Sequence, residues 1–187
     1  MTNHTALVIV DVQANALAHL ADSAGVVAAL GTAIAAAREA SVPVLFVGMA
    51  FRPEAPEVSP QNSGITAWAA DGANRIGDPA VAFPTELTPA AGDVVLTKSR
   101  GSAFEGTDLG IILRSQGITD LVIAGTITGG GVTSTVRQAS DLDYRLTVLS
   151  DGCADPDADL HRALVEKLFP RQAEVLTTAE WAAGLTR

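Results

Sequence analysis

Six short apolar runs recur along the chain, and most are followed by a stretch with helical spacing. The first run, ALVIV, is continuously apolar and β-branched. A run without polar alternation is typical of a strand covered on both faces, as in a parallel sheet. The repeated strand–helix order therefore predicts an α/β fold, a parallel sheet with helices on both sides. The predicted strands cover residues 6–10, 43–47, 93–97, 121–124, 144–149 and 173–176.

The helices between these runs have recognisable ends. Asp22 and Ser23 are N-cap candidates for a helix that continues to about Ala40, and the distance from the first strand to the second matches a βαβ crossover. Thr107 can cap a helix that Gly117 would end. Further helices are predicted from about residue 132 to 142, from Asp157 or Asp159 onward, and over residues 177–185.

One domain, residues 1–187, is expected from the chain length. Regular patterning fades over residues 48–92, where six prolines interrupt it, and a connection this long is usually a functional loop or lid. Within it, Arg52 and Trp68 are the residues best able to hold a polar small molecule. The alternatives are a surface ion pair for Arg52 and a core or interface position for Trp68.

Charge and composition exclude several function classes. A formal net charge of -9 and a pI near 4.6 argue against binding to nucleic acid or to anionic membranes, because both require clustered Lys and Arg. No apolar run approaches a membrane span of about 20 residues, and the N-terminus lacks the features of a signal peptide, so a cytoplasmic protein is expected. One cysteine and three histidines make a poor metal-binding set, so neither a metal nor another cofactor is expected.

Two charged residues directly follow predicted strands. Asp11 ends the first strand, with Gln13 two residues later, and Lys98 ends the third. Side chains at the carboxyl ends of parallel strands share one edge of the sheet, where such folds bind ligands. Pairing between the two is favoured, because a lysine after a buried strand needs a carboxylate nearby to remain charged. The alternatives are a turn-capping aspartate and a solvated surface lysine.

A glycine-rich turn follows the fourth strand and contains Gly125 and the triplet 129–131. It matches neither the dinucleotide nor the P-loop pattern, so its glycines indicate close backbone approach to a substrate or neighbour. No side chain in this turn is an obvious nucleophile. Ser102 has no general base nearby in sequence, and Cys153 is interpreted as a buried small residue.

Three blocks together resemble the isochorismatase-like (cysteine hydrolase) superfamily over nearly the whole chain: IVDVQ, TKSRGSAFEGTDL, and AGTITGGGVTSTVRQA followed by DYRLTVLSDGCAD. The resemblance implies a Rossmann-like, three-layer α/β/α fold with a six-stranded parallel sheet. It also implies a homo-oligomer, dimer or tetramer, that acts on a small-molecule substrate. The metal ligands of nicotinamidase-like members have no counterpart after residue 47.

The family site combines an aspartate, a lysine and usually a cysteine, which correspond here to Asp11, Lys98 and Gly131. The nucleophile is therefore missing. The resemblance also implies a cis peptide at Thr126–Ile127 and an oxyanion hole formed by the backbone N–H groups of Ile127 and Gly131. True isochorismatases resemble this chain in having glycine at the cysteine position, and they cleave a vinyl ether without a nucleophilic side chain.

The expected function is cysteine-independent acid–base hydrolysis of a small polar metabolite, with enol-ether hydrolysis as one form. Asp11 would be the acid or the base, because a raised pKa suits proton donation whereas a charged Lys98 favours the carboxylate. Gln13, Arg52, Trp68 and Phe104 are the predicted substrate-binding residues. The alternative is a catalytically degenerate homologue, a pseudoenzyme that binds a small molecule or a partner.

Overall fold

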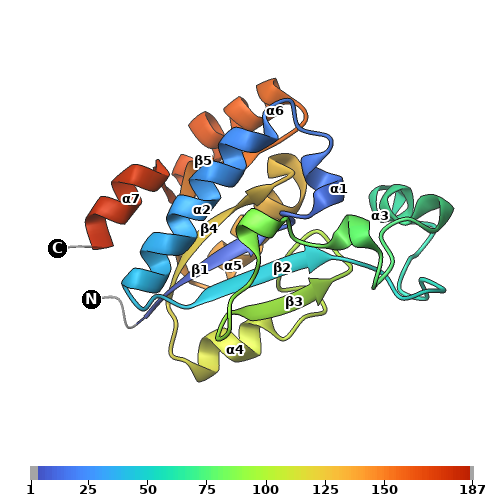
Figure 1. The fold of residues 1–187 in the computed structure, drawn as a ribbon, viewed down its shortest axis with the longest axis horizontal. Helices are drawn as coiled ribbons and strands as arrows, with labels where there is room; N and C mark the ends of the chain where they lie inside the picture. The colour runs from blue at the N-terminus through green and yellow to red at the C-terminus, as the bar shows by residue number, and fades with distance from the viewer. Residues whose placement is uncertain (1–3, 186–187) are drawn as a thin grey trace.

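One sheet of six parallel strands forms the centre of the molecule in the computed structural model, which describes residues 4–185 (Figure 1). The strand order is β3-β2-β1-β4-β5-β6, and every neighbouring pair is parallel. The α/β prediction and the six-stranded Rossmann-like sheet are thus confirmed. The strands are β1 (Thr5–Val10), β2 (Val44–Met49), β3 (Val94–Lys98), β4 (Asp120–Thr126), β5 (Arg145–Ala154) and β6 (Glu174–Leu176).

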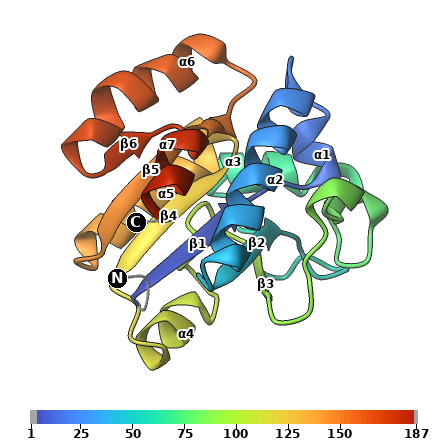
Figure 2. The ribbon, with the colours of Figure 1, turned by 60° about the vertical axis from the view of Figure 1, so that its left-hand side comes forward.

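Helices cover both faces of this sheet (Figure 2). α2 (Ser23–Glu39) and α7 (Thr178–Leu185) pack on one face, and α4 (Leu109–Ser115) and α5 (Thr133–Asp141) pack on the other. The segment after α6 (Ala158–Ala163) adds apolar side chains to the second layer.

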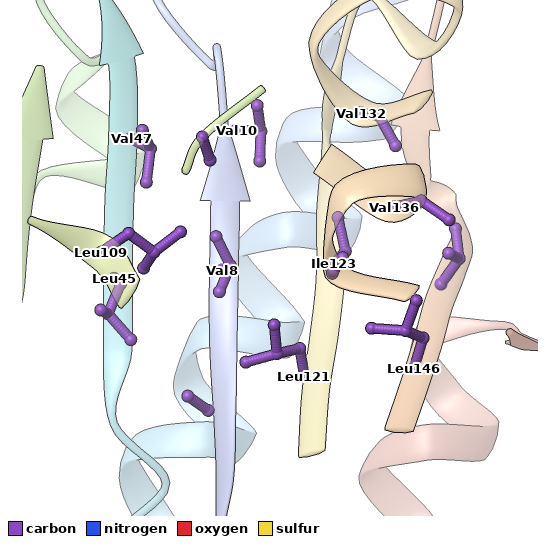
Figure 3. Packing of buried hydrophobic residues seen from close by; sticks show 14 of the residues in the cluster. Val8, Val10, Leu45, Val47, Leu109, Leu121, Ile123, Val132, Val136 and Leu146 are labelled. Carbon is purple, nitrogen blue, oxygen red and sulfur yellow. The ribbon is translucent and has the colours of Figure 1, made fainter. Parts of the chain in front are cut away.

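Strand β1 is buried on both sides, which explains its continuous apolar run. Leu7 and Ile9 belong to the core under α2, whereas Val8 and Val10 belong to the core under α4 and α5 (Figure 3). All four side chains have no exposed area. Complete burial of an aliphatic side chain of this size contributes about 1.5–3 kcal/mol.

The predicted helix ends are largely confirmed. Asp22 caps α2 by accepting the N–H of Gly25 at 2.9 Å, and Asp157 caps α6 by accepting the N–H groups of Asp159 and Leu160. Gly117 follows α4 with a φ of 66°, a left-handed conformation that glycine adopts without strain.

The long connection between β2 and β3 is more ordered than its sequence suggested. It contains α3 (Ser63–Trp68) and three 3-10 turns (Ala70–Gly72, Pro79–Val81 and Thr85–Leu87), and α1 (Ala14–Leu17) was also not predicted. A small cluster of Phe51, Ile65 and Ala69 gives the connection its own core. These helices are too short for periodicity to reveal them.

The side on which successive strands are added to the sheet changes between β1 and β4. Strands are added outward from β1 to β3 on one side and from β4 to β6 on the other. Ligands of open α/β sheets bind at such a switch point, outside the carboxyl ends of the strands. The strands meet closely here, because a Cβ atom at Gly125 would lie 2.0 Å from the backbone oxygen of Val10.

The turn after β4 differs from expectation in one respect. No cis peptide bond occurs among residues 4–185, so the expected cis bond at Thr126–Ile127 is absent. Ile127 has instead a left-handed backbone (φ 56°, ψ 62°), which turns the chain sharply into a π-helical turn, Thr128–Val132, ahead of α5. None of the helices over residues 4–185 is long and apolar enough to cross a membrane.

Candidate active site

A cavity of about 330 Å³ opens at the switch point. Asp11 follows β1, Ile127 and Gly131 belong to the turn after β4, and α3 of the long connection closes the opposite side. The cavity is lined by Asp11, Gln13, Asn15, Ala16, Met49, Asn62, Gly64, Ile65, Trp68, Gly101, Ile127, Gly130, Gly131 and Ser134.

Asp11 and Lys98 form a buried ion pair beside this cavity. Nζ of Lys98 lies 2.9 Å from Oδ2 of Asp11, and the Lys98 side chain has no exposed area. The ammonium also donates to the carbonyl oxygens of Arg100 at 2.9 Å and Gly101 at 2.8 Å. Its three N–H groups are therefore all used, which confirms the pairing expected from the strand ends.

The Asp11 backbone is held in a sparsely populated conformation. Its φ is 56°, its N–H donates to the oxygen of Val47 at 2.9 Å, and the hydroxyl of Thr126 donates to its carbonyl oxygen. A left-handed conformation is uncommon for a residue with a side chain, although aspartate tolerates it better than most. The two neighbouring strands thus aim this carboxyl at the switch point.

The Asp11 carboxyl is poorly solvated. Its Oδ1 is buried and has no hydrogen-bond partner among the residues that the structure describes. Burial raises the pKa of Asp11 above its usual range, and the opposing effect of the Lys98 charge does not outweigh it. The environment therefore holds the proton on this carboxyl more tightly than water does.

Gly131 lies directly against this carboxyl. A Cβ atom at position 131 would be 2.1 Å from Oδ2 of Asp11 and 3.2 Å from Cγ1 of Val10. Heavy atoms do not approach so closely without a bond, so a side chain at position 131 requires the Asp11 carboxyl or the turn itself to shift. The absence of a side chain at Gly131 is a requirement of the site's present geometry.

The model of the isochorismatase domain family matches residues 5–180 of this chain. The chain belongs to the isochorismatase family. An uncharacterised family protein from Bacillus subtilis, YwoC, is 32% identical over 177 residues, 95% of this chain and 92% of that protein. The ureidoacrylate amidohydrolase RutB of Pseudomonas syringae pv. syringae is 35% identical over 172 residues, 79% of this chain and 69% of that protein.

Solved structures of this family share the fold. A cysteine hydrolase from Pseudomonas syringae pv. phaseolicola 1448A superimposes with a TM-score of 0.91 at 25% identity, covering all of this chain and 94% of the other. An isochorismatase family protein from Burkholderia thailandensis gives a TM-score of 0.86 at 30% identity, covering 100% and 98% of the two chains.

Two of the predicted substrate-binding residues of this isochorismatase-family protein line the cavity. Trp68 presents its ring at the end of α3. Gln13 is also in the wall, but its amide is already engaged: it donates to the oxygens of Val81 and Met49 and accepts the N–H of Met49. Gln13 therefore ties the long connection to β2, and these contacts use both N–H groups of its amide.

The other two predicted substrate-binding residues do not reach the cavity. Arg52 is exposed and pairs with Glu57 at 3.6 Å, which is the surface ion pair given as its alternative. Phe104 packs against the ring of Tyr144 at 5.7 Å and contributes to the core under α4 and α5. Position within a loop does not reveal which side chains turn inward, and both predictions rested on it.

Cys153 has no place in this site. It is buried in the core beside Gly125, and burial raises the pKa of its thiol to about 12, far above that of a reactive thiol. The interpretation of Cys153 as a buried small residue is thus confirmed.

His161 contacts the hydroxyl of Thr128 at 3.0 Å, and burial lowers the pKa of its imidazole.

Several lining residues of this family member were not identified from the sequence. Asn62 had a usable signal, because it stands in the N-cap position of α3 and accepts the N–H of Ile65 at 3.1 Å. Asn15 and Ser134 offered none, since both resemble ordinary surface helix residues. Over residues 4–185 no three His, Cys, Asp or Glu side chains are grouped so that they could hold a metal ion.

Proposed function

We propose that this protein hydrolyses a small molecule by acid–base chemistry at Asp11, without a cysteine nucleophile. The observation that carries the proposal is the contact between Asp11 and Gly131. The carboxyl oxygen fills the space in which a side chain at position 131 would begin. Gly131 takes the cysteine position in the resemblance to the superfamily, so the acid lies against the point from which a cysteine side chain would start there.

Asp11 is proposed as the general acid. The raised pKa brings the carboxyl closer to the range of a general acid, and a proton transferred to the substrate leaves a carboxylate 2.9 Å from the Lys98 ammonium. The ion pair therefore becomes stronger as the reaction proceeds. Lys98 stabilises the charge that develops, which is how an oriented charge in a buried site lowers a barrier.

Enol-ether hydrolysis matches these groups best. Asp11 protonates the terminal alkene carbon, water adds to the resulting oxocarbenium carbon, and the adduct collapses to a ketone and an alcohol while the carboxyl regains a proton from the water. The backbone N–H groups of Ile127 and Gly131, both in the cavity wall, are proposed to bind the substrate oxygen. No step requires a covalent bond to the protein.

Amide hydrolysis is the reaction suggested by the name of the relative RutB. It normally proceeds through an activated nucleophile, and the single cysteine of this chain is buried and lies outside the cavity. The geometry therefore favours the enol ether over the amide.

The proposal is tested by mass spectrometry of reactions with small enol ethers and amides, such as 2-methoxyacrylamide and maleamide. We expect loss of the enol ether with release of methanol, at the same rate in wild type and in Cys153→Ala. Consumption of the amide group with the enol ether untouched, or loss of activity in Cys153→Ala, would contradict the mechanism. If neither compound is consumed but one of them raises the Tm of the protein, the binding-protein alternative is favoured.

The contact at position 131 has a test of its own. Gly131→Ala is expected to lower kcat/KM by at least about tenfold, because the added methyl group displaces the Asp11 carboxyl by tenths of an ångström or more. Gly184→Ala in α7 is the matched control, since a Cβ there meets no atom within 4 Å. Equal kcat/KM for the two variants would show that the space at residue 131 is not needed.

A further inference from the structure

The cavity wall contains no cationic side chain. Among the lining residues that the structure describes there is no Lys, Arg or His, and Asp11 is the only ionisable one. An anionic group that leaves water needs a cation or several donors in compensation, or its burial is costly. This wall provides no cation, so only neutral donors such as the Ser134 hydroxyl and the proposed backbone N–H groups could compensate it.

Arg75 of the long connection and Arg100, which follows β3, are engaged elsewhere. Arg75 donates through Nε to the oxygen of Pro53 at 3.0 Å and through Nη2 to that of Ala69 at 3.1 Å. Arg100 donates to the oxygens of Ser99 at 2.7 Å and Glu57 at 2.8 Å. Both guanidinium groups thus hold the backbone of the connection in shape. Their movement toward the cavity would leave these carbonyl oxygens unpaired.

Lys98 lies beside the cavity, but its ammonium has no free N–H group to donate to a substrate. Its side chain has no exposed area, and its three N–H groups are used by Asp11, Arg100 and Gly101. A substrate carboxylate could gain a hydrogen bond from Lys98 only by displacing one of these partners.

A second cavity of about 660 Å³ adjoins the first and shares Asn15, Trp68 and Ile127 with it. Its wall includes two carboxylates, Asp78 and Asp155, and one histidine, His19, whose ring lies 6.5 Å from that of Trp68. A substrate that entered by way of this second cavity would pass these carboxylates before it reached Asp11. Like charges along the path disfavour an anion further.

We infer that the substrate carries no carboxylate and enters the cavity with an uncharged polar end. The inference rests on the proposed hydrolysis at Asp11 and defines the substrate class of that site. The Ser134 hydroxyl makes no hydrogen bond to any other residue over 4–185 and lines the cavity, so it is available to a neutral hydroxyl or amide group. Trp68, Ile65 and Met49 contribute an apolar wall for the remainder of the molecule.

A matched pair of probes tests this directly: 2-methoxyacrylamide, which is neutral, and 2-methoxyacrylate, which is an anion at neutral pH. Dissociation constants are measured by calorimetry and by the shift in Tm, and turnover is measured separately by release of methanol. The amide is expected to bind about tenfold or more tightly than the acid, because only the acid loses the solvation of a charge with no cation in the wall to replace it. This ordering can be obtained even if neither probe is hydrolysed, so failure of the proposed chemistry is distinguishable from failure of the inference.

Two variants at one position provide the control. Ser134→Lys places a cation in the wall and is expected to lower the ratio of the Kd for the acid to the Kd for the amide by about fivefold or more. Ser134→Gln, which is of similar size and uncharged, should not lower this ratio. The inference is overturned if the wild type binds the acid as tightly as the amide or more tightly. It is also overturned if neither probe binds, or if the lysine and glutamine variants behave alike.

Discussion

Asp11→Asn is expected to lower kcat/KM by about 10²–10⁴-fold, the usual contribution of a general acid. Asparagine has nearly the shape of aspartate and can still accept a hydrogen bond from Lys98, but it has no acidic proton to donate. Steady-state kinetics on the enol ether that the wild type consumes measures the effect.

The pH profile distinguishes a general acid from a general base at Asp11. Burial raises the pKa of this carboxyl, so the proton donor is present at low pH and is lost as the pH rises through the raised pKa. The wild-type kcat/KM is therefore expected to fall with increasing pH, and the residual activity of Asp11→Asn should not show that fall. A wild-type rate that instead rises with pH through the same range would assign Asp11 the role of a base.

Asp120→Asn is the matched control for the substitution at Asp11. Asp120 begins β4, at the opposite end of the strands from the cavity, and pairs with the exposed Arg145. The control should retain wild-type kcat/KM, since an exposed ion pair contributes little. A loss of less than a few-fold in Asp11→Asn, with the fold intact by circular dichroism, would contradict the proposed mechanism.

Lys98→Met is expected to lower the free energy of unfolding by about 3–5 kcal/mol, because removal of one partner from a buried pair leaves the other without compensation. Methionine fills a similar volume but cannot donate to Asp11 or to the carbonyl oxygens of Arg100 and Gly101. Urea denaturation measures the change.

This loss of stability should depend on pH. Without Lys98 the opposing effect on the pKa of Asp11 disappears, so the folded-state pKa rises further above its unfolded value. A group with a raised folded pKa is compatible with the fold while it is protonated, and the associated stability is lost as the pH rises through that pKa. The deficit of Lys98→Met should therefore be smallest at low pH.

The chain provides a close control for this experiment in its second lysine, Lys167, which is exposed after α6. Lys167→Met should change the unfolding free energy by no more than about 0.5 kcal/mol. The double variant Asp11→Asn/Lys98→Met should recover part of the lost stability, because no charge then remains buried at the site. A similar loss in both single lysine variants would show that the ion pair is not a stabilising unit.

The strands, and the position of Asp11 and Lys98 at their ends, could be predicted from the sequence. The apolar runs are local signals, because a strand covered on both faces needs apolar residues at every position. Parallel topology then places the carboxyl ends of all strands at one edge of the sheet. For this reason the ion pair, separated by 87 positions in the sequence, was predictable from two short segments.

The long connection limited what could be predicted about the cavity wall. Arg52 was chosen for its charge and Phe104 for its place in the loop after β3, but Arg52 lies at the surface and Phe104 packs against the core. Asn62 and Ile65 line the cavity because α3 folds back over the switch point, and that path depends on contacts such as those of Gln13 with Met49 and Val81. No local pattern encodes such contacts.

Gly131 illustrates which properties of the site follow from the sequence and which depend on the tertiary structure. The sequence by itself determined the α/β fold, the strand ends that present Asp11 and Lys98, and the lack of a nucleophile in the turn after β4, because each depends on residue type and local spacing. Only the tertiary structure showed that Asp11 occupies the space beside Gly131, that burial raises its pKa, and that no Lys, Arg or His among the described residues lines the cavity. These properties depend on distances and solvation between segments far apart in the chain, which exist only once the strands and the long connection have packed together.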